Sequence, residues 1–320
     1  MAKFISIILF NLISLSLLAQ DLKAVDEYVV QRFLKVKDID VLATKINQKY
    51  TDPLSKSRAI YCFIANTIAY DVDAWKNPQR GYKFTYKTEA EKLEKLEKIR
   101  IEKAEKAIRS RKAVCDGYST LFEILCEKTG VECYTVNGTS KAFVSDLPKK
   151  TVDKIPNDHA WNIITIKGEK YLVDATWGAG SVDFNQQFVK NYTDTYFMMP
   201  PKDFILNHYP SSEGDKLINV NKKTFYDYPL FYLDYFLSHV ELVQPLNKEV
   251  KSKKAFQMVF TDVNNQNDLL FAYDDSKYAL EVKFSKRGNK LIAEVPASTA
   301  KSKYFNVYFK NSSIVTFLVK

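Results

Sequence analysis

Three residues of this chain have the side chains needed to form and release a thioester, and each stands in a distinctive context. Cys115 lies in Arg-Lys-Ala-Val-Cys-Asp-Gly-Tyr, His159 in Asp-His-Ala-Trp-Asn, and Asp174 in Tyr-Leu-Val-Asp-Ala-Thr-Trp. A thiolate attacks a carbonyl carbon, an imidazole transfers the proton, and a carboxylate orients the imidazole and stabilises its charged form. These side chains predict acyl-transfer chemistry if the fold brings them together.

The cysteine is predicted to lie where an extended segment becomes a helix. The residues from Asp116 to Lys128 carry apolar side chains at helical spacing, and Gly130 can end the helix in a left-handed conformation. At the start of such a helix, the dipole and the unpaired backbone N–H groups favour a thiolate and could hold an oxyanion. Gly117, two residues after Cys115, allows a neighbouring segment to pass closely.

The histidine and the aspartate are predicted to lie on the two strands of one hairpin. Strands are expected over 160–166 and 169–174, joined by the dipeptide Lys-Gly as a two-residue turn. Asp174 then lies opposite Trp161, and His159 lies one diagonal step away on the same face, within reach of the carboxylate. A slip of one residue would send Asp174 to the other face of the hairpin.

These contexts resemble the transglutaminase-like superfamily, a group of cysteine enzymes of papain-like architecture. The resemblance is carried by Arg-Lys-Ala-Val-Cys-Asp-Gly-Tyr-Ser, Asn-Asp-His-Ala-Trp-Asn-Ile and Lys-Tyr-Leu-Val-Asp-Ala-Thr-Trp-Gly, in this order. The sequence is most similar to the branch typified by the kyphoscoliosis peptidase and the cytokinesis protein Cyk3. The resemblance covers about residues 50–245 and implies an α+β fold, in which a helix bearing the cysteine packs on an antiparallel sheet bearing the histidine and the aspartate.

The resemblance implies a catalytic triad of Cys115, His159 and Asp174. Ala113 departs from the family pattern, in which glycine is usual, and alanine fits there unless the backbone needs a positive φ. Further residues are candidates for the substrate cleft: Tyr70, Asp116, Gly117, Trp161 and Trp177. Core packing is the alternative role for the two tryptophans. No cofactor is implied. No metal site is expected either, because the chain has no Cys-x-x-Cys, no His-Glu-x-x-His and no calcium-type loop of carboxylates.

The chain is long enough for about two domains. Its first residues carry one positive charge, Lys3, before an apolar run that ends near Ala19, which predicts a signal peptide. A membrane anchor is the alternative, but the run is short for a span and is interrupted by polar residues. We expect a signal peptide over 1–20, an N-terminal helical segment over 21–49, a transglutaminase-like catalytic domain over 50–245 and a C-terminal β-sandwich-like domain over 246–320.

Other segments of the chain predict elements around this framework. Lys and Glu dominate 86–111, with a narrow line of apolar residues between them, which predicts a solvated helix that could cap or gate the cleft. A partner-binding coiled coil is the alternative. A strand over 131–136 is expected to end at the turn pair Asn137-Gly138. Beyond about residue 245, short alternating segments predict strands of an all-β sandwich over 255–260, 279–284, 290–295, 304–309 and 314–319.

The distribution of charge indicates whether nucleic acid is an expected partner. The net charge is +9, but the basic residues are spread among glutamates, which favours a solvated surface over a nucleic-acid groove.

Four cysteines in an exported protein could form two disulfides. Cys62 and Cys126 lie in apolar helical stretches, where a buried thiol is the commoner state. Pairing of Cys126 with Cys133 stays open.

The sequence therefore predicts a secreted or periplasmic cysteine-dependent enzyme. It would act as a peptidase or amidase that cleaves amides, or it would cross-link them to an amine. Its expected partner is a protein or peptide substrate, cell-wall peptides included, with no nucleic acid and no stable membrane span after signal cleavage. The oligomeric state is left open. A catalytically silent transglutaminase-like scaffold of the cell envelope is the alternative.

Overall fold

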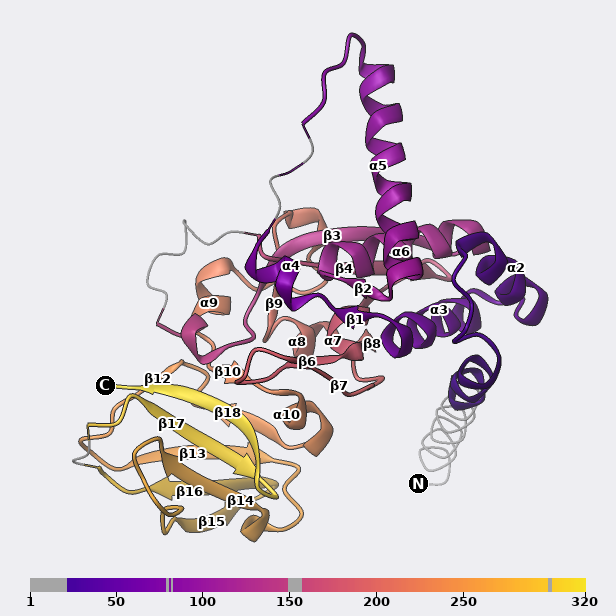
Figure 1. Ribbon diagram of the computed structural model, residues 1–320. Helices are drawn as coiled ribbons and strands as arrows, with labels where there is room; N and C mark the ends of the chain where they lie inside the picture. Colours follow the sequence, from indigo (N-terminus) through magenta and orange to yellow (C-terminus); the bar gives the residue numbers. More distant parts are fainter. Residues whose placement is uncertain (1–21, 79–80, 82, 149–156, 299–300) are drawn as a thin grey trace. The chain divides into compact units, whose positions relative to one another are not determined.

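The computed structural model describes residues 22–78, 81, 83–148, 157–298 and 301–320 (Figure 1). The predicted signal peptide lies outside these residues. The described residues fall into two compact units, and the chain leaves the first unit within a strand and returns to it at His159. The first unit holds the described residues up to Val136 and those of His159–Met199, and the second holds those of Asn137–Asp158 and Pro200–Lys320.

Several helices of the first unit begin after a residue whose side chain caps them. Asp38, Asp52 and Thr88 each accept a hydrogen bond from a backbone N–H in the following turn, which satisfies a donor that the helix leaves without an intrahelical partner. The helices are a segment over 22–32, α2 (Ile39–Lys49), α3 (Pro53–Thr67), α4 (Val72–Lys76), α5 (Glu89–Ser110), α6 (Cys115–Thr129) and α7 (Ala175–Ala179).

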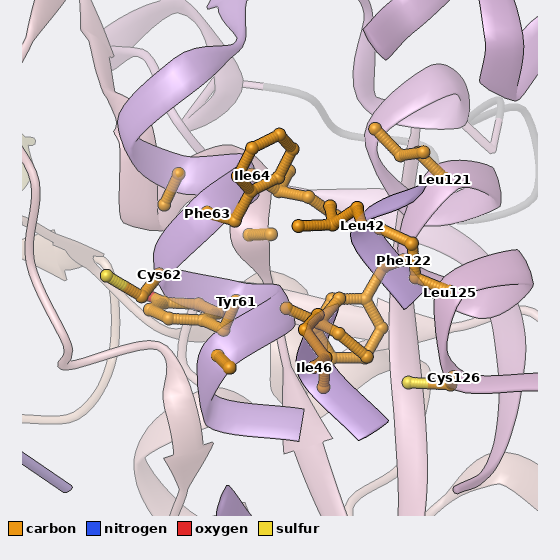
Figure 2. Close-up of a cluster of buried hydrophobic side chains, with 14 of the residues drawn as sticks. Leu42, Ile46, Tyr61, Cys62, Phe63, Ile64, Leu121, Phe122, Leu125 and Cys126 are labelled. Atoms are coloured by element: carbon orange, nitrogen blue, oxygen red, sulfur yellow. The ribbon is translucent and has the colours of Figure 1, made fainter. Parts of the chain in front are cut away.

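The core of the first unit forms where α2, α3 and α6 meet. Figure 2 shows Ile46 of α2, Ile64 of α3 and Phe122 of α6 among the side chains of this cluster, and all three are fully buried. The same core includes Ile164 and Val173 of the sheet. Burying such side chains contributes about 1.5–3 kcal/mol each, so this core fixes the helix that begins at Cys115 against the sheet.

The sheet of the first unit contains the predicted hairpin. Ile166 pairs with Glu169 across the turn, and the φ angles of the turn residues are 54° at Lys167 and 82° at Gly168. A type I′ turn requires a positive φ at both of its central residues, and this turn type matches the twist of the paired strands. The predicted register is therefore confirmed. The strands lie in the order β8-β5-β4-β3, with bounds β3 (Glu132–Ser140), β4 (His159–Ile166), β5 (Glu169–Val173) and β8 (Phe197–Met199).

β3 is longer than predicted. It continues through Asn137-Gly138 to Ser140, because its last three residues pair antiparallel with β9 (His208–Pro210). Neither Asn137 nor Gly138 has a positive φ. The predicted turn at this dipeptide is therefore wrong, since a partner strand from far along the chain supplies the backbone hydrogen bonds.

Two short strand pairs complete the first unit. β1 (Ala69–Tyr70) lies parallel to β2 (Lys112–Ala113), and β6 (Gly180–Val182) lies antiparallel to β7 (Phe188–Lys190). The β1–β2 pair joins the end of α3 to the segment that leads into α6.

A buried ion pair fastens the helix over 22–32 to α3. The side chain of Arg58 is 4% exposed, and its guanidinium donates hydrogen bonds of 2.8 and 2.6 Å to the carboxylate of Asp26. Tyr192 donates another, of 2.8 Å, to the same carboxylate. Burial alone would lower the pKa of Arg58, but the hydrogen bond to Asp26 raises it above its ordinary value. The helix over 22–32 is thus part of the core of the first unit.

The second unit contains a sandwich of two sheets, with the strand orders β10-β18-β17-β14 and β11-β13-β16-β15. Neighbouring strands in these two orders pair antiparallel, and β12 joins the first sheet by pairing parallel with β18. The predicted fold class, an α+β core followed by an all-β sandwich, is confirmed. In this unit α8 (Pro201–Phe204) precedes β9, and the elements after β9 are α9 (Lys222–Asp227), β10 (Leu230–Phe231), α10 (Leu233–Ser238), β11 (Glu241–Gln244), β12 (Glu249–Val250), β13 (Phe256–Thr261), β14 (Leu269–Tyr273), β15 (Lys283–Arg287), β16 (Lys290–Val295), β17 (Tyr304–Phe309) and β18 (Ser312–Val319).

The sandwich differs from its sequence-based prediction in three respects. β14 was not expected, and the strand expected over 279–284 begins at Lys283. The apolar core of the sandwich also includes Phe231, Tyr235 and Leu242, upstream of the expected start at 246. These aromatic and aliphatic side chains pack onto the sandwich. β10 and α10 are too short to give a recognisable strand or helix pattern in the sequence.

α5 packs on α6 through the side of its C-terminal half. Ala104, Ala107 and Ile108 are buried, whereas Leu93 is 64% exposed. In Figure 1 the N-terminal half of α5 stands away from the other helices of the first unit. The predicted solvated helix is present, and its apolar seam is covered over only part of its length.

The cysteines and the helices bear on two further predictions. Cys62 and Cys126 are fully buried, as predicted. All four cysteines lie among the described residues, and none is joined in a disulfide. No helix in the described part of the chain combines the length and the apolar content that crossing a membrane requires.

Candidate active site

Cys115 is the first residue of α6. Val114 before it is extended, and its side chain does not cap the helix. Two contacts hold this junction in place: the backbone N–H of Asp71 donates to the carbonyl of Ala113 at 2.9 Å, and the hydroxyl of Tyr118 donates to the carbonyl of Ile68 at 2.7 Å. The thiol therefore sits at the positive end of a 15-residue helix, where a thiolate is favoured.

Gly117 allows α6 to begin close to the segment that precedes it. A Cβ atom on Gly117 would lie 2.7 Å from the Cβ atom of Ala113, a separation that real side chains do not show. Ala113 itself has no positive φ, so alanine fits at this position although it departs from the family pattern. The two positions have complementary sizes.

Asp174 is held in one orientation by the chain around it. It is fully buried and caps α7, with Oδ1 accepting from the backbone N–H groups of Thr176 at 2.8 Å and Trp177 at 3.0 Å. Its own N–H donates to the carbonyl of Tyr196 at 2.9 Å. The other carboxylate oxygen, Oδ2, lies 2.7 Å from Nε2 of His159. The cap therefore aims the second oxygen at the imidazole.

The environment of His159 favours its charged form. Burial lowers the pKa of this imidazole, but the negative charge of Asp174, the hydrogen bond to it and a hydrogen bond with Cys115 together raise the pKa to about 10. Because Nε2 is engaged by Asp174, Nδ1 is the ring nitrogen left for the hydrogen bond with the thiol. The three residues predicted from the sequence therefore lie together, with the imidazole between the sulfur and the carboxylate.

Aromatic rings surround the imidazole. The ring centroid of His159 lies 6.0 Å from that of Trp161 and 5.9 Å from that of Trp177, whose ring meets Tyr196 edge-on at 5.5 Å. Trp161 is buried and Trp177 is half-buried. These rings exclude water from the imidazole–carboxylate pair and so strengthen its electrostatic attraction.

The other predicted site residues lie near the start of α6, and their roles stay predictions. Tyr70 is half-buried in β1, where it pairs with Ala113. The carboxylate of Asp116, directly after the cysteine, forms an ion pair with Lys103 of α5. This contact ties α5 to the first turn of the cysteine-bearing helix.

Two residues near the triad were not singled out from the sequence. A Cβ atom on Gly178 would lie 2.0 Å from the hydroxyl oxygen of Tyr61, which donates to the carbonyl of Thr193 at 2.7 Å. Asn162, three residues after His159, is buried and donates to the carbonyl of Ser119 in α6. The available signal was that both residues stand inside quoted motifs, Asn162 in His-Ala-Trp-Asn and Gly178 at the end of Asp-Ala-Thr-Trp-Gly. Nothing local to Gly178 indicates its distant neighbour Tyr61.

The raised pKa of His159 predicts how stability depends on pH. A group whose pKa is raised by folding contributes stability that is fully present below its unfolded pKa, 6.5 here, and is lost as the pH rises through the folded value of about 10. We expect the free energy of unfolding of the wild type, relative to His159→Gln, to fall across this range by up to about 1.4 kcal/mol per pH unit. Urea unfolding at a series of pH values measures it, and a pH-independent difference would contradict it.

Comparison with known proteins supports the resemblance to the transglutaminase-like superfamily. Residues 40–175 match the model of the Transglutaminase-like superfamily. The kyphoscoliosis peptidase of Homo sapiens is 32% identical over 210 residues, which cover 65% of this chain and 28% of that protein. The Mus musculus protein is 32% identical over 182 residues, which cover 56% and 24%. A solved structure described as a TGase has a TM-score of 0.29 and 19% identity, covering 50% of this chain and 36% of its own.

The chain spans about a quarter of the length of the curated relatives it matches. The matched region includes Cys115 and His159 and extends through Asp174. The sequence matches agree with the resemblance carried by the three motifs. Residues 40–175 of this chain are thus similar to the transglutaminase-like superfamily, and the chain resembles the kyphoscoliosis peptidase branch.

Proposed function

We propose that this protein is an exported cysteine-dependent enzyme that cleaves amide bonds in protein or peptide substrates through a thioester on Cys115. The observation that supports the proposal most strongly is the hydrogen-bonded order of sulfur, imidazole and carboxylate, with the carboxylate locked by its helix cap. Similarity to the transglutaminase-like superfamily supports acyl transfer in general. Water is the acceptor we favour, because we identify no dedicated amine site.

The reaction follows from the positions of the three groups. The sulfur of Cys115 attacks the amide carbon, and the oxyanion is stabilised by backbone N–H groups at the start of α6. The imidazolium of His159 gives its proton to the leaving amine as the carbon–nitrogen bond breaks. His159, now neutral, removes a proton from water, which attacks the thioester and releases the carboxylic acid and the thiolate. Asp174 orients the ring throughout and stabilises its charged form.

Substitution of the nucleophile tests this proposal. The purified protein is assayed against libraries of peptides and of glutamine-containing acyl donors, with Cys115→Ala as the inactive variant and Cys133→Ala as the control. We expect Cys115→Ala to lower turnover by at least about 1000-fold, because removing a nucleophile eliminates the covalent route. Cys133→Ala, at a half-buried thiol of β3, is expected to keep wild-type activity.

The same experiment separates the enzyme from the scaffold alternative. Activity that survives Cys115→Ala, or a Cys115 that an electrophilic thiol probe labels no faster than a free cysteine, would count against the enzyme. Export rests on the sequence of residues 1–20. The intact mass of the secreted product shows whether those residues are removed, and a product that retains them contradicts cleavage.

A further inference from the structure

A buried polar cluster joins α6 to the sheet close to the triad. The side-chain amide of Asn162 donates to the carbonyl of Ser119 at 3.1 Å and to the hydroxyl of Thr135 at 3.3 Å. The hydroxyl of Thr135 in turn donates to the carboxylate of Glu123. Asn162 and Ser119 are almost completely buried. We call these four residues, from α6, β3 and β4, the Asn162 cluster.

The cluster lies between the elements that carry the three triad residues. Ser119 is one helical turn after Cys115 in α6, and Asn162 is three residues after His159 in β4. Asn162 is also paired in the hairpin register with Val173, which immediately precedes Asp174. A shift at Asn162 would therefore change the positions of the thiol and the imidazole relative to each other.

Hydrogen bonds are needed between α6 and the sheet because apolar packing alone does not fix the position of the helix along the strands. The contacts between α6 and the sheet set the spacing of the two layers, but burial of apolar surface is non-directional and does not fix how far the helix slides along the strands. Hydrogen bonds from a buried amide are satisfied in only one arrangement and are costly to break. A hydrogen bond between the sulfur of Cys115 and the imidazole of His159 forms only if α6 and β4 are held in one such arrangement.

We propose that Asn162 is a positioning residue for the Cys115–His159 pair, and that Thr135 supports it. The inference rests on the proposed function, since it assumes that Cys115 and His159 act together. Asn162 holds α6 at the position along β4 at which the thiolate and the imidazolium stabilise each other. Glu123 and Thr135 hold the amide in its orientation from the other side.

The pH profile of Cys115 alkylation by iodoacetamide tests this role, with the modified peptide quantified by mass spectrometry. A thiolate paired with an imidazolium reacts at pH 6, whereas an ordinary thiol reacts only near its own titration range. We expect Asn162→Leu to lower the rate at pH 6 by roughly 10- to 100-fold, as a displacement of about 1 Å does at active sites, with a small change at pH 9. Thr135→Val is expected to have a smaller effect in the same direction.

Two controls separate positioning from stability. Thr135→Ser keeps the hydroxyl and is expected to keep the wild-type profile. Asp26→Ala destabilises the same unit through a different contact. It is also expected to keep the wild-type pH profile of Cys115 alkylation, at a temperature where circular dichroism shows every variant folded. If Asn162→Leu does not fold, the Thr135→Val and Thr135→Ser pair decides the question.

The outcomes distinguish this inference from the proposed function. If the wild type lacks reactivity at pH 6, the proposed function fails and this inference fails with it. If the wild type reacts at pH 6 and folded Asn162→Leu has the same profile, only the role of Asn162 is overturned. If Asp26→Ala changes the profile as strongly as Asn162→Leu, the effect is one of stability and the inference is again overturned.

Discussion

Replacing His159 with glutamine is expected to slow the alkylation of Cys115 at pH 6 by roughly 100-fold. The thiolate is the form of a cysteine that reacts, and a neighbouring imidazolium favours it over the thiol. Asp174 stabilises the imidazolium of His159, and the substitution removes this positive charge from beside the sulfur. The rate of iodoacetamide labelling of the Cys115 peptide measures the effect.

The matched control for this experiment is His239→Gln, because His239 is exposed and lies in the second unit. It is expected to label at the wild-type rate. Cys133, in the same sample, reports the reactivity of a thiol outside the triad. Equal labelling of Cys115 in His159→Gln and the wild type at pH 6 would show that the two side chains do not act as a pair.

Removing the carboxylate of Asp26 is expected to lower the free energy of unfolding by about 3–5 kcal/mol. The substitution Asp26→Ala leaves the guanidinium of Arg58, which is almost completely buried, without its bidentate partner, and only the longer contact of 3.2 Å to the exposed carboxylate of Asp194 remains. Removing the main partner of a buried charge is costly, far more than the loss of a surface ion pair. Urea unfolding followed by circular dichroism measures the change.

The double variant Asp26→Ala with Arg58→Met checks the cause. It removes both charges, so it should be less destabilised than Asp26→Ala alone. Asp40→Ala serves as the exposed counterpart, because the side chain of Asp40 is 79% exposed in its ion pair with Lys128. It is expected to change the free energy of unfolding by less than about 1 kcal/mol. Similar losses for Asp26→Ala and Asp40→Ala would contradict the argument.

The triad was predictable because its contexts are local. The register of β4 and β5 depends on a two-residue turn and on alternation along two short strands, so the contact of His159 with Asp174 could be derived from spacing. The start and end of α6 likewise depend on residues next to them, with Gly130 ending it at a φ of 74°. The hairpin register and the ends of α6 could be predicted because each depends only on residues within its own segment.

The rest depended on segments far apart in the sequence. Lys141, in a stretch of ordinary polarity, is buried, and its ammonium donates to the carbonyls of Phe225 at 2.9 Å and Tyr228 at 3.0 Å. The extension of β3 through Asn137-Gly138 required β9 as its partner. Such contacts leave no periodic pattern in either segment, which is why the local turn signal gave the wrong prediction.

The close fit of Gly117 against Ala113 has a consequence for the history of this site. With an alanine at 113, any side chain at 117 would collide with it, so the second position could not change first. A lineage with glycine at both positions could acquire a methyl group at either one, but the first acquisition would prevent the other. The presence of Ala113 therefore makes the order of substitutions matter: a side chain at position 117, close to the nucleophile, becomes acceptable only after position 113 has changed to glycine.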